Sequence, residues 1–170
     1  MSGESAPLGV GAIDVSVVIP TYRREDLVGQ AVRSALDQQG VAVEVIVVDD
    51  APGATARPAV TAMGDPRVHY TARSEPSGGR PARVRNDGAR RARGRYIYFL
   101  DDDDLLEPAA LASLVQVLDA HPEVGMAFGQ VTPFGEDAVK LRDHEQYFRD
   151  AARRASRAMG RREFAASLVY

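Results

Sequence analysis

Residues 96–104 read YIYFLDDDD, so an apolar run leads directly into four consecutive carboxylates. The aromatic and branched residues of 96–100 predict a strand, which places the carboxylates at its end. Four adjacent like charges repel one another, and a divalent cation removes that repulsion. Hard oxygen ligands suit Mg²⁺ or Mn²⁺, which share their coordination shell with a substrate's phosphates. The alternative is an acidic turn that caps the next helix, because aspartate is favourable at a helix N-terminus.

Four further apolar runs predict strands that accompany this one. They cover residues 15–20 (VSVVIP), 43–48 (VEVIVV), 124–131 (VGMAFGQV) and, more weakly, 68–71 (VHYT). The runs are continuous rather than alternating. This is typical of strands that are covered on both faces, as in a parallel sheet.

Segments with apolar residues at helical spacing lie between and after these runs. Residues 26–38, 81–93 and 108–120 each predict a helix, and residues 143–158 predict an arginine-rich one. Residues 161–170 look like the start of another element. The alternation of strand and helix predicts an α/β fold, a Rossmann-like three-layer sandwich with a mostly parallel central sheet.

The composition indicates a folded globular protein. The chain has 170 residues, of which 45% are hydrophobic, enough for one domain with a core. No apolar run approaches the roughly 20 residues that span a bilayer. Residues 1–14 lack the basic start and apolar core of a signal peptide, so we expect a flexible leader and a cytoplasmic protein. The absence of cysteine excludes thiolate ligands, and the net charge of −3 argues against nucleic acid as a partner.

Polar residues follow three of the predicted strands. The first strand runs into Thr21 and Tyr22, the second into Asp49 and Asp50, and the third into the cluster at 101–104. In parallel α/β sheets, ligands bind beyond the carboxyl ends of the strands. We therefore expect these residues to converge on one ligand site.

A glycine- and arginine-rich segment, SGGRPARVRNDG at 77–88, lies between the second and third of these strand ends. Paired glycines let a backbone pass close to a ligand. Arg80, Arg83 and Arg85 could neutralise a diphosphate. The alternative is a surface loop that opens an amphipathic helix whose arginines face water.

Taken together, three blocks resemble the family 2 glycosyltransferases in order and spacing. They are residues 15–24 (VSVVIPTYRR), 45–50 (VIVVDD) and 84–104 (VRNDGARRARGRYIYFLDDDD). The resemblance covers about residues 15–131 and implies the GT-A fold, a nucleotide-diphospho-sugar donor, a Mn²⁺ or Mg²⁺ ion and an inverting, hexosyltransferase-like reaction. It divides the chain into the leader, a nucleotide-sugar-binding core at 15–135 and a short helical acceptor part at 136–170.

The resemblance also assigns the nucleoside site. It carries base recognition to Asp50, with Pro20, Thr21 and Tyr22 lining the same pocket. A carboxylate there can accept a hydrogen bond from a pyrimidine N–H, which favours a UDP-sugar. Many relatives have asparagine after the tyrosine, where this chain has Arg23, and this departure bears on nucleotide specificity.

Phosphate and metal contacts are assigned in the same way. Arg85 matches a ribose or phosphate contact, with Asn86 beside it. Asp103 is the expected main metal ligand and Asp101 the second. The alternative role for Asp101, shared with Asp102, is a contact with the ribose or with the water shell of the metal.

The resemblance implies a carboxylate base that deprotonates the acceptor, in a region downstream of the aspartate cluster. The usual motif for that base is not recognisable in this chain. Five polar residues that follow residue 131 are candidate substitutes for this base. They are Glu136, Asp137, Asp143, His144 and Glu145. Their alternative role is to form the polar start of a helix.

Three other hypotheses remain open or are disfavoured. A catalytically incomplete module that binds a nucleotide-sugar and acts with a protein partner or as an oligomer fits the same motifs. A nucleotidyltransferase or a dinucleotide-binding dehydrogenase is disfavoured, because no glycine-rich loop follows the first strand. The acceptor, whether glycan, lipid or small molecule, is not determined. The arginines of 149–162 leave a membrane-peripheral location open, although a solvated helix face also explains them.

Overall fold

The computed structural model describes residues 12–78 and 80–154. The chain divides into two compact units, the first ending at Ala112 and the second beginning at Ser113. Most of the predicted leader and all of the element expected at 161–170 lie outside the described residues. The domain limits drawn from the sequence stay a prediction.

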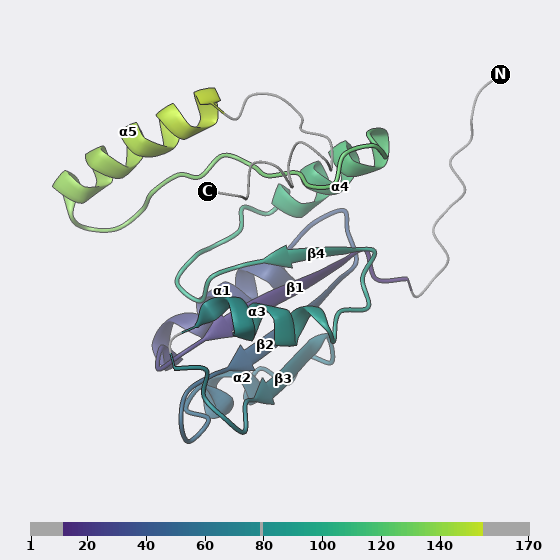
Figure 1. The fold of residues 1–170 in the computed structure, drawn as a ribbon, viewed down its shortest axis with the longest axis vertical. Coiled ribbons are helices and arrows are strands. Elements are labelled where there is room, and N and C mark those ends of the chain that lie inside the picture. The colour runs from purple at the N-terminus through teal and green to yellow at the C-terminus, as the bar shows by residue number, and fades with distance from the viewer. Residues whose placement is uncertain (1–11, 79, 155–170) are drawn as a thin grey trace. The chain divides into compact units, whose positions relative to one another are not determined.

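The first unit is built on a four-stranded sheet in which all strands run parallel, in the order β3-β2-β1-β4 (Figure 1). Val18 of the first strand pairs with Ile46 of the second and Phe99 of the fourth, which fixes the register. Each strand confirms one predicted from an apolar run. They are β1 (Val15–Thr21), β2 (Val43–Asp49), β3 (Val68–Ala72) and β4 (Tyr96–Phe99).

One face of this sheet is covered by α3 (Pro81–Ala89). Val84 of the helix is buried against Val18 and Val48 of the sheet. A Cβ on Gly88 would lie 2.3 Å from Val18 Cγ1, so only glycine lets the helix approach so closely. This close contact fixes the distance between α3 and the face of the sheet.

The other face is covered by α1 (Glu25–Leu36) and α2 (Arg57–Thr61), which also pack on each other (Figure 1). The apolar side of α1 points to the sheet and is buried; it consists of Val28, Ala31, Val32 and Ala35. Helices on both faces of a parallel sheet make the three-layer α/β architecture predicted from the sequence. The short α2 was not predicted.

A buried polar cluster closes the amino-terminal edge of the sheet. Glu44 is 1% exposed and accepts hydrogen bonds from the Ser16 hydroxyl at 2.6 Å and from Arg93 Nη2 at 2.6 Å and Nε at 2.8 Å. Burial by itself would raise the pKa of Glu44, but the hydrogen bonds from Ser16 and Arg93 outweigh it and lower that pKa. The cluster ties β1 and β2 to the turn that follows α3.

The second unit contains most of α4 (Ala110–Ala120) and all of α5 (Ala138–Arg154). The helix α5 begins earlier than the predicted residue 143. Asp137 caps it, because its Oδ1 accepts the backbone N–H groups of Val139 at 3.0 Å and Lys140 at 3.1 Å. The predicted continuation beyond Arg154 lies outside the described residues. Within those residues, no helix has the length and apolar character needed to cross a bilayer.

The strand predicted at residues 124–131 is wrong. The structure has irregular backbone over most of that segment, and Phe128 and Val131 are exposed. Gly125 and Gly129 interrupt the apolar run. Glycine weakens a strand interior because it offers no side chain to pack and loses more backbone entropy than other residues.

Candidate active site

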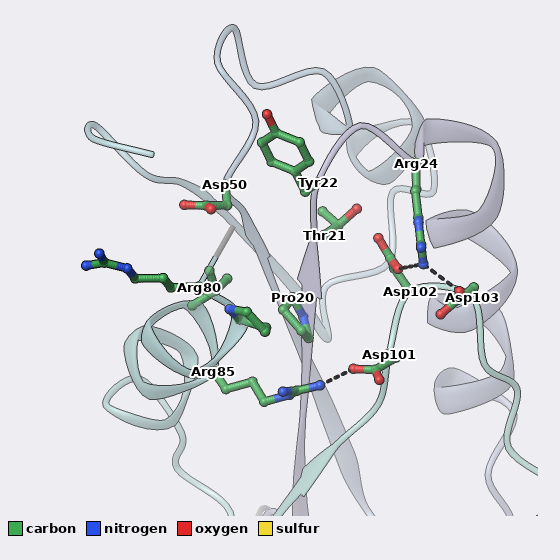
Figure 2. A pocket seen from close by; sticks show the side chains of 12 residues that line it. Pro20, Thr21, Tyr22, Arg24, Asp50, Arg80, Arg85, Asp101, Asp102 and Asp103 are labelled. Atoms are coloured by element: carbon green, nitrogen blue, oxygen red, sulfur yellow. Dashed lines mark hydrogen bonds and ion pairs between the residues drawn. The ribbon is translucent and has the colours of Figure 1, made fainter. Parts of the chain in front are cut away.

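The carboxyl ends of β1, β2 and β4 border a cavity of about 460 Å³ in the first unit (Figure 2). Because the strands are parallel, their ends meet at one edge, as expected from the sequence. Most of the predicted site residues line the cavity: Pro20, Thr21, Tyr22, Asp50, Arg85, Asp101, Asp102 and Asp103. Asn86 is exposed and is not among the described residues that line it.

The two aspartates that end β2 have different roles. Asp49 is fully buried and accepts hydrogen bonds from the N–H groups of Ala51 and Ala56 at 2.9 Å and from the Tyr70 hydroxyl at 2.8 Å. Burial, followed by the hydrogen bond to Asp49 and its charge, raises the pKa of Tyr70, so the hydroxyl stays a donor. Asp49 therefore holds the loop after β2, and Asp50 lines the cavity.

Asp50 is 3% exposed, and its carboxylate is held by Ser77 and Arg73. Its Oδ1 accepts the Ser77 N–H at 2.7 Å and Arg73 Nε at 2.9 Å. Its Oδ2 accepts the Ser77 hydroxyl at 2.7 Å. A carboxylate has about four acceptor positions, two on each oxygen. Among the described residues, the groups that bond to Asp50 therefore fill Oδ1 and leave one position on Oδ2.

Thr21 places a hydroxyl without a partner beside the cavity. The residue is 3% exposed, and within the described part of the chain its Oγ1 has no hydrogen-bond partner. Buried polar atoms in folded proteins are nearly always hydrogen-bonded, because leaving one unpaired is costly. Since Thr21 lines the cavity, a bound ligand is a candidate partner for this hydroxyl.

Tyr22 is followed by a residue with strained backbone. Arg23 has a φ of 54°, in the left-handed region that asparagine tolerates better than arginine. Its guanidinium lies 5.3 Å from the centre of the Tyr22 ring. An asparagine at this position would tolerate the left-handed backbone better than arginine does.

Two arginines offset part of the negative charge of the aspartate cluster, and Figure 2 shows them reaching it from opposite sides. Arg24 Nη1 lies 3.0 Å from Asp102 Oδ1 and 2.5 Å from Asp103 Oδ2. Arg85 pairs with Asp101. The hydrogen bond to Asp102 and its charge, with a smaller contribution from Asp103, raise the pKa of Arg24.

The same cluster retains mutual repulsion. Burial, followed by the negative charges of Asp103, Asp101 and Asp102, raises the pKa of Asp104. Two of these carboxylates, on Asp102 and Asp103, already converge on a single cationic nitrogen.

This donor set fits a hard divalent ion. Magnesium is commonly bound by one or two carboxylates and completed by substrate phosphates and water, and manganese prefers similar oxygen ligands. No group of three or more His, Cys, Asp or Glu side chains within residues 12–78 and 80–154 could hold a metal by itself. An ion held by Asp102 and Asp103 would take its remaining ligands from water and from a phosphate.

Sequence reasoning had no means of finding the partners of these carboxylates. Arg24 lies 78 positions from Asp102, and Ser77 lies 27 positions from Asp50. Lys and Arg together number 21, so charge alone does not single out Arg24 or Arg73. The loop that contains Arg73 and Ser77 reaches Asp50 only through tertiary folding.

The candidate bases all belong to the second unit. Glu136, Asp143 and Glu145 are exposed, and Asp137 caps α5, where hydrogen bonds from the Lys140 and Val139 N–H groups lower its pKa. Their catalytic role stays a prediction.

Comparison with known proteins is consistent with this geometry. The family model described as Glycosyl transferase family 2 matches residues 16–166. The succinoglycan biosynthesis protein ExoO of Rhizobium meliloti (strain 1021) is 44% identical over 108 residues. That match covers 63% of this chain and 30% of ExoO, so the chain spans less than a third of this relative's length.

Two solved structures resemble the described fold. The mannosyltransferase PcManGT from Pyrobaculum calidifontis, in complex with GDP-Man and Mn²⁺, has a TM-score of 0.59 and 29% identity, and the match covers 71% of this chain and 36% of that one. S. aureus TarS 1–349 in complex with UDP-GlcNAc has a TM-score of 0.58 and 25% identity, with coverage of 71% and 38%. These neighbours confirm the GT-A fold expected from the sequence.

Proposed function

This chain belongs to glycosyl transferase family 2, and we propose on that premise that it binds a UDP-sugar with a divalent metal and transfers the sugar to an acceptor, with inversion. The observation that carries the proposal is the cavity at the strand ends. One end of it has the buried carboxylate of Asp50, and the other has carboxylates that converge on a cation. Thr21, whose hydroxyl has no partner among the described residues, lies between them (Figure 2). A nucleoside diphosphate has complementary groups at the same two ends.

The preference for uracil is supported by Asp50. Only one acceptor position, on Oδ2, is left by the described residues that bond to it. A uracil or thymine ring offers a single N–H between two carbonyl oxygens and needs one acceptor. Guanine offers two neighbouring donors, which are best met by both oxygens of a carboxylate. Of the two solved neighbours described above, one holds UDP-GlcNAc and the other GDP-Man, so the argument for uracil rests on the local geometry of Asp50.

Asp103 would hold the metal, as expected from the sequence, and we propose Asp102 rather than Asp101 as the second ligand, because Asp102 and Asp103 converge on one nitrogen of Arg24. The metal would offset the charge of the departing diphosphate. Arg85 extends from α3 toward the same region, where it pairs with Asp101, and it would bind a phosphate or the ribose. Arg80 also lines the cavity and would add a second positive charge. The acceptor and the base that deprotonates it belong to the part of the proposal that rests on family membership.

The experiment that tests the metal site compares two neighbouring aspartates. Asp103→Asn should weaken UDP binding in the presence of Mn²⁺ by about tenfold or more, because a charged ligand is lost. It should leave the weaker binding measured in EDTA unchanged. Calorimetric titration of UDP into both proteins, with Mn²⁺ and with EDTA, measures both quantities.

Asp104→Asn is the matched control, since Asp104 is in the same cluster but is not among the described residues that line the cavity. It should keep the Mn²⁺-dependent affinity within about threefold of the wild type. Unchanged affinity in Asp103→Asn would remove that residue from the metal site. Binding of UDP without transfer or donor hydrolysis, over a panel of UDP-sugars, would favour the non-catalytic binding module.

A further inference from the structure

Arg73 lies just after β3 and bridges two carboxylates from different parts of the first unit. Its Nε lies 2.9 Å from Asp50 Oδ1, and its Nη1 pairs with Asp87 of α3. The arginine side chain is 17% exposed, and those of Asp50 and Asp87 are 4% and 20% exposed. The planar fork of a guanidinium can serve two carboxylates at once, which an ammonium group cannot do with the same geometry.

The backbone around Arg73 is fixed by the sheet. Its N–H donates to the Asp49 carbonyl oxygen at 2.9 Å, and Ala72 pairs with Asp49 in the register of β2 and β3. The guanidinium therefore starts from a rigid strand end. Ser77 completes the enclosure of Asp50 through its N–H and its hydroxyl, both at 2.7 Å.

We propose that Arg73 is a positioning residue that sets base specificity, by filling Oδ1 of Asp50 and so presenting a single acceptor to the nucleotide base. This inference rests on the proposed function, because it assigns Arg73 to the base-binding end of that site. Without Arg73, Oδ1 regains an acceptor position, and both oxygens of Asp50 can serve a base with two donors.

The link to Asp87 gives the arginine a second effect. Asp87 lies two positions after Arg85 on α3, and Val84 of the same helix lines the cavity. Through Arg73, the carboxylate at the base end is joined to the helix that carries the phosphate-facing arginine. The spacing between the two ends of the site is thereby held.

A structural role alone makes a different prediction from a positioning role. If Arg73 only stabilises the fold, its loss lowers the affinity of every ligand of the cavity by the same factor. If it positions Asp50, its loss lowers UDP affinity, spares a ligand without a base and narrows the preference for UDP over GDP. Pyrophosphate with Mn²⁺ is the ligand without a base.

The experiment is calorimetric titration of UDP, GDP and pyrophosphate, each with Mn²⁺, into the full chain and its Arg73→Gln variant. We expect Arg73→Gln to weaken UDP binding by about tenfold and to lower the UDP-to-GDP affinity ratio by a similar factor. Pyrophosphate affinity should change by less than about twofold.

Arg90→Gln is the matched control, because Arg90 pairs with the same Asp87 but is exposed and has no described contact with Asp50. It should leave all three affinities within about twofold of the wild type. Arg73→Lys keeps the charge but loses the fork, and it should give an intermediate UDP-to-GDP ratio. This milder variant carries the test if thermal melting shows that Arg73→Gln is not folded.

An unchanged UDP-to-GDP ratio in the folded Arg73 variants would overturn the inference while leaving the proposed function intact. An equal loss of UDP and pyrophosphate affinity would also overturn it, since Arg73 would then act only through the fold. A wild-type chain that binds pyrophosphate but shows no preference among nucleotides would overturn the inference and the uracil assignment together. A wild-type chain that binds none of the three would overturn the proposed function and, with it, the inference.

Discussion

At the scale of single residues, the site is defined by which polar atoms already have partners. Both oxygens of Asp49 are bonded within the fold, whereas Asp50 keeps an acceptor position and Thr21 Oγ1 lacks a partner among the described residues. A polar group that is buried without a partner lowers the stability of the fold. Such groups can therefore be assigned to ligand binding and tested separately from folding.

Thr21→Val should separate binding from stability. The substitution keeps the side-chain shape and removes the unpaired hydroxyl, so the free energy of unfolding should stay equal or rise by up to about 1 kcal/mol. UDP affinity should fall by about threefold to tenfold, because the ligand loses a hydrogen bond. Urea denaturation and UDP titration of the same preparation measure the two effects.

Thr61→Val is the control, since its hydroxyl on α2 bonds to the Arg57 carbonyl and does not line the cavity. It should not change UDP affinity. A Thr21→Val protein that loses stability and keeps UDP affinity would show that the hydroxyl serves the fold.

Arg24 makes a prediction about the metal alone. Its guanidinium contacts the two carboxylates that would hold the ion, so arginine and metal compete for the same oxygens. Arg24→Gln should raise Mn²⁺ affinity in the absence of nucleotide by about twofold to fivefold, a modest change because Arg24 is half exposed. Electron paramagnetic resonance of free Mn²⁺ measures this.

The neighbouring Arg23→Gln should leave Mn²⁺ affinity unchanged, because Arg23 lies over Tyr22. A fall in Mn²⁺ affinity in Arg24→Gln would mean that Arg24 supports the metal site and does not compete with the ion.

At the scale of elements, the sequence predicts what depends on local pattern. The strands at 15–20 and 43–48 follow from continuous apolar runs, and their parallel pairing follows from alternation with helices. The short α2 escapes prediction because five residues are too few to show a helical period. The segment 124–131 has apolar content without the uninterrupted side chains that a strand needs.

The ends of elements were predicted better than the contacts between them. Parallel pairing alone brings Thr21, Asp50 and Asp101 to one edge, so their convergence could be expected before the structure. The pairing of Arg73 with Asp50 depends on how the loop after β3 folds back, and no periodicity encodes that. The side chains that face the ligand could therefore be predicted from the sequence, whereas the residues that hold those side chains in place could not.

The cluster at the start of β1 and β2 makes a prediction about pH. The pKa of Glu44 is lowered in the folded chain, so its charge stabilises the fold above the unfolded value of 4.5, and this stabilisation is lost as the pH falls through the lower folded value. Glu44→Gln should lower the free energy of unfolding by about 1–2 kcal/mol at pH 7. This loss is small for a buried carboxylate, because its partner Arg93 is largely exposed. The difference between the two proteins should shrink below about pH 4.5.

Urea denaturation of wild type and Glu44→Gln at pH 7, 5 and 3.5 measures this difference. The exposed Glu123→Gln in the second unit is a control that should show little cost at any pH. A difference that is constant or grows on acidification would contradict the assignment of Glu44 as an ionised, hydrogen-bonded carboxylate.

At the scale of the whole molecule, the residues of the cavity and the candidate bases lie in different compact units. The cavity, the aspartate cluster and the two arginines that pair with it all belong to the first unit. The candidate bases belong to the second. The cavity of the first unit is the part of the described structure on which the proposed donor binding rests.

The cavity is proposed to select a nucleotide whose base offers a single N–H, uracil or thymine over guanine, together with a divalent metal. Calorimetric titration of UDP, dTDP and GDP into the wild-type chain, first with Mn²⁺ and then with EDTA, tests this selection. We expect UDP to bind about tenfold or more tightly than GDP, with most of that affinity lost in EDTA. dTDP should lie close to UDP, because thymine presents the same N–H. Equal affinity for UDP and GDP, or binding that is insensitive to EDTA, would contradict the claim.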